Sequence, residues 1–140
     1  MPRWMMHLSL VVAITLSLAL AATKPAHADD AARQVISDQL TAFQQDDFAT
    51  AFTFASPMIK GMFGTSERFG EMVRNGYPMV WRPSEVEFLD TRDVGGALVQ
   101  DVLIRDADGV YYELEYEMIA GEDGWKINGV RVRRAGEGTA

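Results

Sequence analysis

The spacing of apolar side chains changes near Glu85, and this change limits the fold more than any other feature of the sequence. Before that point apolar residues recur every three or four positions, as Ala32, Ile36, Leu40 and Phe43 do, which is the period of an α-helix buried on one face. After it, apolar and charged residues alternate in segments separated by glycine-rich turns, as in half-buried strands. The pattern predicts an α+β fold in which N-terminal helices pack on a curved antiparallel sheet.

Short helices with polar caps are expected before the change of period. The capping signals are Asp29-Asp30, Asp46-Asp47, Ser56-Pro57 and Thr65 or Ser66. The first helix is expected to reach about Gln45. Tyr77-Pro78 and Arg82-Pro83 then predict an extended segment, because a residue before proline avoids the helical conformation. Met58 and Met62 are expected to fill gaps in the core.

The turn at residues 106–109 sets the pairing of the two central strands. Asp at its first position and Gly at its fourth predict a type I turn with a left-handed glycine. That turn places Gln100 opposite Tyr116, on an otherwise apolar face that also holds Tyr112. A register different by one residue would put Asp101 on the face of these tyrosines. Because the first register makes the cleaner apolar face, Asp101 is expected on the solvent side.

The last hairpin needs one extra residue to keep its apolar side chains on the core face. Val130 and Val132 have the wrong parity unless Asn128-Gly129 forms a bulge. The bulge brings arginines of the last strand beside an acidic run made of Glu113, Glu115 and Glu117. The expected cross-strand pairs are Arg131 with Glu115 and Arg133 with Glu113. These pairs explain the acidic run better than the alternative, a metal site, does.

Residues 1–28 are typical of a secretory signal peptide. Arg3 supplies the positive start, Leu8–Ala22 is mostly apolar, and Ala26-His27-Ala28 is a small-residue cleavage site. An uncleaved membrane anchor is the alternative, but a spanning helix needs about 20 apolar residues. We expect cleavage after Ala28, export to the periplasm or beyond, and no stable membrane span. The mature chain is then divided into one domain, 29–134, and a flexible tail, 135–140.

Once the leader is removed, the chain holds neither cysteine nor histidine. The sequence has no Cys, and both histidines, His7 and His27, fall in the leader. Their loss excludes disulfides, thiol nucleophiles, Cys/His zinc sites and histidine acid–base catalysis, so no metal and no cofactor are expected. Removal of Arg3 and Lys24 takes the formal net charge from −7 to −9. Such a chain would repel a nucleic acid.

Several segments are similar to one family of small exported bacterial proteins. They are Phe43–Ile59, Met72–Pro83, Val99–Leu103, Asp108-Gly109 and Gly124–Gly129. Through them the chain resembles the family described as domain of unknown function 4864, within the nuclear-transport-factor-2-like superfamily. The resemblance implies a cone-shaped fold in which helices close over the concave face of the sheet. It also implies a small apolar or aromatic ligand on that face, a homodimer formed through the sheet, and no assigned activity.

Six residues are candidates for contact with such a ligand: Tyr77, Trp81, Arg82, Gln100, Tyr112 and Tyr116. The segment from Tyr77 to Arg82 would form a pocket rim for an anionic or aromatic molecule. The alternative is a packed crossing loop, in which Arg82 donates to carbonyl groups at a helix end. Gln100 and Tyr116 would either satisfy each other or orient the ligand.

Three functions from different classes stay open. The first is a non-catalytic domain that binds a small ligand or a protein partner, and another is a structural or accessory protein with a filled cavity. The third is a cofactor-independent isomerase or cyclase, implied by the similarity of some cone-shaped proteins to ketosteroid isomerase. In that case Asp101 would move a proton while Tyr112 or Tyr116 donates to the oxyanion. Because Asp101 is expected to point away from the concave face, we expect a binding domain.

Overall fold

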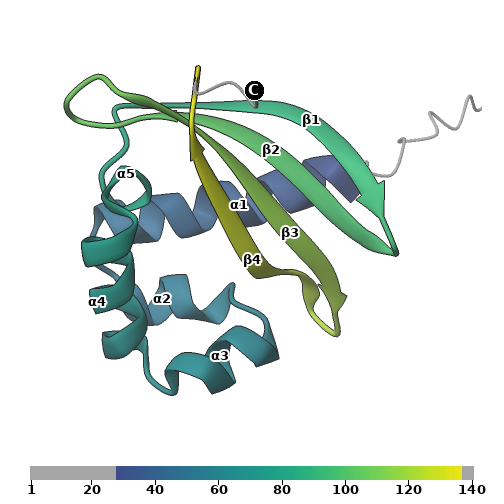
Figure 1. Cartoon of the computed structure of the whole chain (residues 1–140). Coiled ribbons are helices and arrows are strands. Elements are labelled where there is room, and N and C mark those ends of the chain that lie inside the picture. Colours follow the sequence, from purple (N-terminus) through teal and green to yellow (C-terminus); the bar gives the residue numbers. More distant parts are fainter. Residues whose placement is uncertain (1–27, 137–140) are drawn as a thin grey trace, which may run out of the picture.

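The structure is a computed structural model that describes residues 28–136. The predicted signal peptide, apart from Ala28, and residues 137–140 of the predicted tail lie outside the described residues. Within 28–136, no helix is long and apolar enough to cross a membrane. The elements, in chain order, are α1 (Ala28–Gln44), α2 (Phe48–Thr53), α3 (Pro57–Phe63), α4 (Ser66–Gly76), α5 (Pro78–Trp81), β1 (Glu85–Val94), β2 (Ala97–Arg105), β3 (Tyr111–Gly121) and β4 (Gly124–Arg134) (Figure 1).

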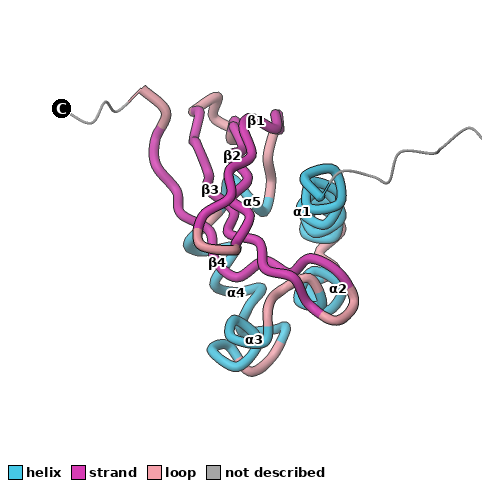
Figure 2. Tube along the Cα trace, turned by 90° about the vertical axis from the view of Figure 1, so that its right-hand side faces the viewer, coloured by secondary structure: helices cyan, strands magenta, loops and turns pink. Residues whose placement is uncertain are grey.

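The strands form one antiparallel sheet in the order β1-β2-β3-β4. Figures 1 and 2 show α1 lying across one face of this sheet, while α2, α3 and α4 gather at one end. The α+β class predicted from the change of hydrophobic period is therefore confirmed. A sheet with helices on one face buries alternate residues of each strand and leaves the others wet, and β2 follows this alternation along its whole length.

Side-chain caps begin three of the helices as the sequence predicts. Asp47, Ser56 and Thr65 each accept a hydrogen bond from a backbone N–H three residues later, those of Thr50, Ile59 and Arg68. Each cap satisfies a donor that the helix itself cannot pair. α1 differs, because it begins at Ala28, and Asp29 and Asp30 lie within its first turn. At this position their negative charges still interact favourably with the positive end of the helix dipole.

The segment from Tyr77-Pro78 to Arg82-Pro83 is not extended, contrary to the prediction. Residues Pro78–Trp81 form the short helix α5. The rule about residues before proline holds for Tyr77 and Arg82 themselves, whose φ values are −134° and −137°. It does not restrict the residues between them, and Pro78 occupies the first position of a helix, where no N–H is needed.

The register between β2 and β3 confirms the prediction made from the turn at 106–109. Gly109 has a φ of 84°, and Gln100 lies opposite Tyr116. The buried residues of these two strands are Leu98, Gln100, Val102, Ile104, Leu114, Tyr116 and Met118. Asp101 pairs with Glu115 on the other face.

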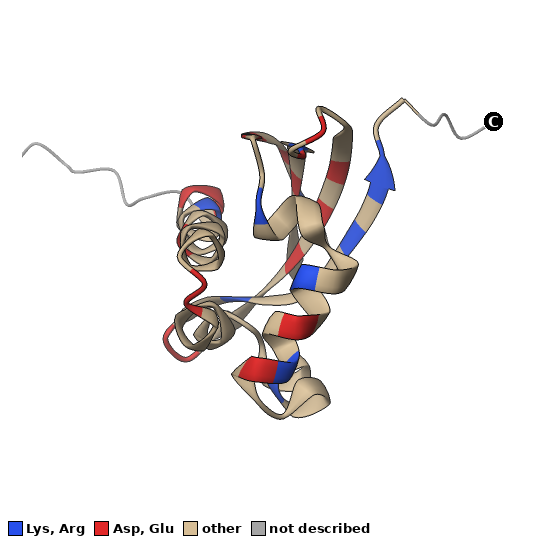
Figure 3. Ribbon diagram, turned by 90° about the vertical axis from the view of Figure 1, so that its left-hand side faces the viewer, with Lys and Arg blue, Asp and Glu red and all other residues tan. Residues whose placement is uncertain are grey.

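The predicted bulge in β4 is also present. Glu117 lies opposite Gly129 and Met118 opposite Ile127, so Asn128 is the extra residue. With the parity restored, Val130 and Val132 pack against the core with Ile127. On the wet face, the predicted cross-strand positions are confirmed, because Glu115 lies opposite Arg131 and Glu113 opposite Arg133. Glu113 forms an ion pair with Arg133, whereas the ion pair of Glu115 is with Arg92 of β1. Figure 3 shows acidic bands on β3 beside basic bands on β4.

A second bulge, in β1, was not expected from the sequence. Phe88 lies opposite Val102 but Thr91 opposite Gln100, so β1 has one residue too many between them. The bulge leaves carbonyl groups outside the strand ladder, and the buried side chain of Gln100 donates to those of Leu89 (3.1 Å) and Asp90 (3.3 Å).

Gln100 also joins α1 to this bulge. Its Oε1 accepts from Arg33 Nε of α1 at 3.0 Å and from the Thr91 hydroxyl at 2.8 Å. Arg33 Nη2 donates to the Leu89 carbonyl at 3.0 Å. Both the donor and the acceptor atoms of this amide are thus used, as a buried amide requires. Gln100 and Tyr116 share a face but do not satisfy each other.

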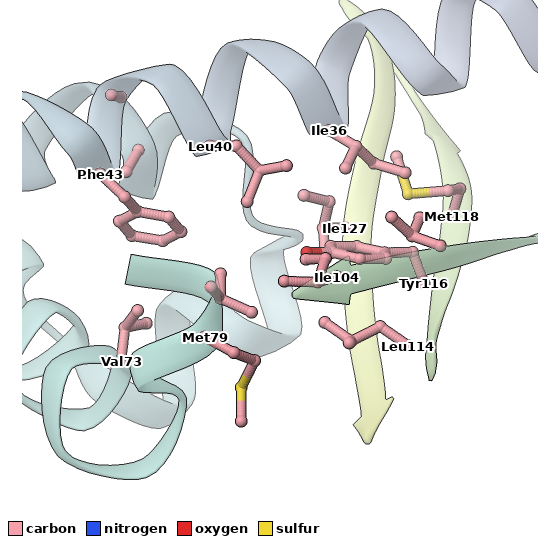
Figure 4. Close-up of a cluster of buried hydrophobic side chains, with 14 of the residues drawn as sticks. Ile36, Leu40, Phe43, Val73, Met79, Ile104, Leu114, Tyr116, Met118 and Ile127 are labelled. Atoms are coloured by element: carbon pink, nitrogen blue, oxygen red, sulfur yellow. The ribbon is translucent and has the colours of Figure 1, made fainter. Parts of the chain in front are cut away.

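The core lies between α1 and the concave face of the sheet (Figure 4). Met58 and Met62 are not part of it, contrary to expectation, since 55% and 65% of their surface is exposed. α3 buries none of its residues fully. Its inward side presents Ile59 and Phe63, which pack against the core, while Met58 and Met62 share a neighbouring, more exposed stripe of the helix.

We predict that Gln100→Leu lowers the free energy of unfolding by about 2–4 kcal/mol, because it leaves the bulge carbonyls and Arg33 without their buried partner. Chemical denaturation monitored by circular dichroism measures this change. The control is Gln45→Leu, at an exposed position just after α1, which should change stability by less than about 0.5 kcal/mol. Equal stability of the two variants would contradict the assigned role of Gln100.

Candidate functional site

A cavity of about 350 Å³ lies between the helices and the β3–β4 side of the sheet. This volume is at the small end of the range for ligand pockets. The lining residues are Gln39 and Phe43 of α1, Ala55, Ile59, Met62 and Phe63 in and before α3, Phe69, Met72 and Val73 of α4, Tyr77 and Val80, and Tyr116, Ile127, Gly129 and Val130 of the sheet.

The wall of the cavity is almost entirely apolar. Three of its lining residues carry a polar side chain, namely Gln39, Tyr77 and Tyr116. Gln39 is buried in α1 and donates through its amide to the Ala51 carbonyl at 3.2 Å. No Asp, Glu, Lys or Arg lines the cavity, so it offers an apolar, uncharged surface on which an apolar molecule would lose its contact with water.

Tyr116 is the polar group placed deepest in this wall. Its side chain is fully buried, and no group of residues 28–136 forms a hydrogen bond with its hydroxyl. Figure 4 shows the ring projecting from β3, with the hydroxyl toward the side of the core where Phe43 and Val73 lie. Burial raises the pKa of Tyr116 above its ordinary value, so the side chain is a neutral phenol that can donate one hydrogen bond.

The outer part of the cavity is formed by partly exposed residues. Ile59 and Phe63 of α3, Met72 of α4 and Val130 of β4 are half-buried, and Met62 is exposed. In contrast, Phe43, Val73, Val80 and Tyr116 at the inner part are buried. α3 and the part of β4 around Val130 therefore border the side from which a molecule can reach the cavity.

Trp81 and Arg82 are predicted site residues that the structure places outside the cavity lining. Arg82 stacks over the Trp81 ring, with Cζ 4.2 Å from the ring centre. It donates to the Phe43 carbonyl in the last turn of α1 at 2.7 Å and to Asp46 Oδ1 at 2.9 Å. Trp81 Nε1 donates to the same Asp46 oxygen at 2.9 Å. These contacts are those of the packed crossing loop.

The Asp46 carboxylate holds this loop against the end of α1. Hydrogen bonds from Trp81 and Arg82 lower the pKa of Asp46 below its ordinary value. Asp46 itself has a φ of 54°, a left-handed conformation that closes the helix end, and its N–H donates to the Phe43 carbonyl. The aromatic and basic groups of the loop are therefore engaged with the protein.

Asp101 and the two tyrosines are not brought together. Asp101 lies on the outer face of β2 and forms an ion pair with Arg92 at 2.9 Å. Tyr116 lies on the inner face, and Tyr112 is half-buried on that same face, outside the cavity lining. A sheet separates the carboxylate from both hydroxyls, so no proton could pass directly between Asp101 and a molecule held by Tyr116.

The acidic run of β3 is engaged in contacts with side chains of β1 and β4. Glu113 pairs with Arg133, Glu115 lies 3.4 Å from Arg92, and Glu117 accepts a hydrogen bond from Asn128 at 3.0 Å. Ion pairs on an exposed face contribute little to stability, and their main effect is to balance the charge of that face.

Of the six predicted ligand residues, Tyr77 and Tyr116 line the cavity. Most of the other lining residues are apolar side chains of helices, and apolar residues at helical spacing do not reveal whether they pack fully or leave space. Gln39 is the lining residue that the sequence could have pointed to, because it is a polar residue on the apolar face of α1. Burial there requires a partner for its amide, or a site that uses it.

We predict that Tyr116→Phe keeps or raises stability, by up to about 1 kcal/mol, because it removes a buried hydroxyl that has no partner. Thermal or urea unfolding measures the change. Tyr111→Phe is the matched control, since Tyr111 is exposed and its hydroxyl lies 3.3 Å from Glu85. A loss of more than about 1 kcal/mol in Tyr116→Phe would show that the hydroxyl is paired within the fold.

Comparison with known proteins places the chain in a family. No curated protein matches it. The family described as Domain of unknown function (DUF4864) matches residues 25–140, which include every described helix and strand. The similarity inferred from the sequence segments is thereby confirmed at the level of this family, and the chain belongs to it.

Proposed function

We propose that this protein is an exported, non-catalytic domain that binds a small apolar molecule in the cavity between α3, α4 and the sheet. The observation that carries the proposal is the cavity itself, about 350 Å³ with an apolar wall. Engineered cavities of about 150 Å³ with such walls stay dry and bind benzene. A space about twice that size suits a molecule of one or two rings or a short hydrocarbon chain.

The arrangement of the helices and sheet supports a cone of the nuclear-transport-factor-2-like kind. The sheet has bulges in β1 and β4, and bulges bend the strands that carry them. α1 crosses the face toward which the core residues point, and α2, α3 and α4 close one end (Figure 1). The cavity lies between these helices and the sheet, which is where a cone-shaped protein of this kind would hold its ligand.

Export is part of the same proposal. A cleavage after Ala28 would remove one residue from α1 and leave every other described element intact. The mature chain would then lack both histidines. Together with the position of Asp101 on the outer face, paired with Arg92, this favours binding over proton transfer, because no Asp, Glu, His or Lys side chain lines the cavity.

Binding in the cavity predicts that a bulky side chain at its outer part displaces the ligand. Ile59→Trp should weaken binding of the neutral probe N-phenylnaphthylamine by about tenfold or more, because the larger ring occupies the space between α3 and β4. Probe fluorescence measures the affinity, and circular dichroism verifies that the variant is folded.

Met58→Trp is the matched control for this experiment. Met58 lies next to Ile59 on α3, is 55% exposed and does not line the cavity. The control should bind the probe as the unchanged protein does. Failure of the unchanged protein to bind the probe, or an equal effect of both substitutions, would argue against a ligand in this cavity.

Export predicts the N-terminus of the mature protein. When the full chain is expressed in a bacterium and the periplasmic fraction is collected, intact-mass measurement should give a chain that starts at Asp29. Ala28→Glu should block the cut, because the cleavage site requires a small residue at that position. Recovery of the protein in the membrane fraction, with residues 1–28 still present, would contradict the proposal.

A further inference from the structure

We infer that the ligand is a neutral molecule with a mainly apolar body and a hydrogen-bond acceptor, such as a carbonyl oxygen, which accepts from the hydroxyl of Tyr116. This inference rests on the proposed function, since it assigns the chemistry of a molecule held in the same cavity. Its basis is the combination of an unpaired, fully buried hydroxyl with an apolar wall.

The buried hydroxyl of Tyr116 lowers the stability of the fold, because no group within residues 28–136 forms a hydrogen bond with it. A buried hydroxyl without a partner costs about 1–3 kcal/mol relative to one that is paired. Phenylalanine would fill the same space on β3 without that cost. The structure thus places a donor where packing alone has no use for it, in the wall of the cavity.

Other buried polar side chains of the core are paired, which separates Tyr116 from them. Gln100 uses both ends of its amide in the β1 bulge, Ser56 accepts from Ile59 N–H and donates to Asn128 Oδ1 at 2.8 Å, and Gln39 donates to Ala51. The unpaired hydroxyl is therefore not a general looseness of this fold. The other buried side-chain atom without a partner among residues 28–136, Arg105 Nε, lies on the outer face of β2, whereas the Tyr116 hydroxyl lies on the face that borders the cavity.

The same wall indicates that the ligand has no net charge. No ionisable group except the two tyrosines, Tyr77 and Tyr116, lines the cavity. An ammonium or carboxylate would lose its hydration there without a counter-charge, which is far more costly than burying a carbonyl group. A neutral acceptor loses little free energy, because the hydrogen bond from the Tyr116 hydroxyl replaces the hydrogen bond that it formed with water.

Contact with the hydroxyl requires a small adjustment of the wall. The oxygen is covered by neighbouring side chains, so an acceptor reaches it when these side chains shift. Met62 and Met72 in the lining have several rotatable bonds and can repack around molecules of different shape. Tyr116 itself is held by β3, which is paired on both sides, so the donor keeps a constant direction.

Two probes of nearly equal shape test this inference. Methyl naphthyl ketone carries the acceptor, and isopropenylnaphthalene has a methylene group in place of the carbonyl oxygen. Their affinities for the unchanged protein and for Tyr116→Phe are measured by displacement of N-phenylnaphthylamine. We expect Tyr116→Phe to weaken binding of the ketone by about three- to tenfold and to leave the hydrocarbon unchanged or slightly tighter.

Tyr111→Phe, on the outer face, is the control and should alter neither affinity. If both probes bind and Tyr116→Phe affects them equally, the hydroxyl does not donate to the ligand, and the inference is wrong while the cavity proposal stands. If neither probe binds the unchanged protein, the cavity proposal itself is wrong. The two failures are therefore distinguishable within one set of measurements.

Discussion

The fold depends on keeping one face of a four-stranded sheet apolar along strands of nine to eleven residues. Side chains alternate with a period of two, so a single misplaced residue would send the rest of a strand to the wrong side. The chain meets this constraint with one extra residue in β1 and one in β4. The bulge at Asn128 lets Ile127 and Val130 share a face, although their spacing in the sequence has the wrong parity.

The two bulges are also the places where helices are attached to the sheet. At the β1 bulge, Arg33 of α1 and Gln100 of β2 occupy the carbonyl groups that the strand ladder leaves free. At the β4 bulge, Asn128 Oδ1 accepts a hydrogen bond from the hydroxyl of Ser56, the residue that caps α3. The backbone N–H of Ser56 donates to the Ile127 carbonyl at 2.8 Å. The same irregularities that correct the parity of the strands therefore fix where the helical layer sits and where it leaves the cavity.

Those attachments mark the limit of what the sequence could predict. The register of β2 and β3 follows from the turn at 106–109, and the β4 bulge follows from parity, because both are local rules. The β1 bulge has no such signal, since Leu89 and Asp90 fit a regular strand equally well, and its stabilisation comes from Arg33, more than fifty residues earlier. The cavity was hidden for a similar reason, because its volume depends on how closely α3 approaches β4 and not on any one residue type.

The position of charge in the molecule then explains why shape dominates the candidate site. Asp101, Glu113 and Glu115 face outward and form ion pairs with arginines of β1 and β4, so the carboxylates of β2 and β3 are turned away from the cavity. Asp46, at the end of α1, is held by Trp81 and Arg82. What faces the cavity is mainly hydrocarbon, together with the amide of Gln39 and the phenols of Tyr77 and Tyr116. Apolar contact gives affinity without much discrimination, whereas a buried donor that lacks a partner favours a molecule that can accept its hydrogen bond. In the complex that we propose, the unpaired hydroxyl of Tyr116 is thus the group that makes the cavity selective.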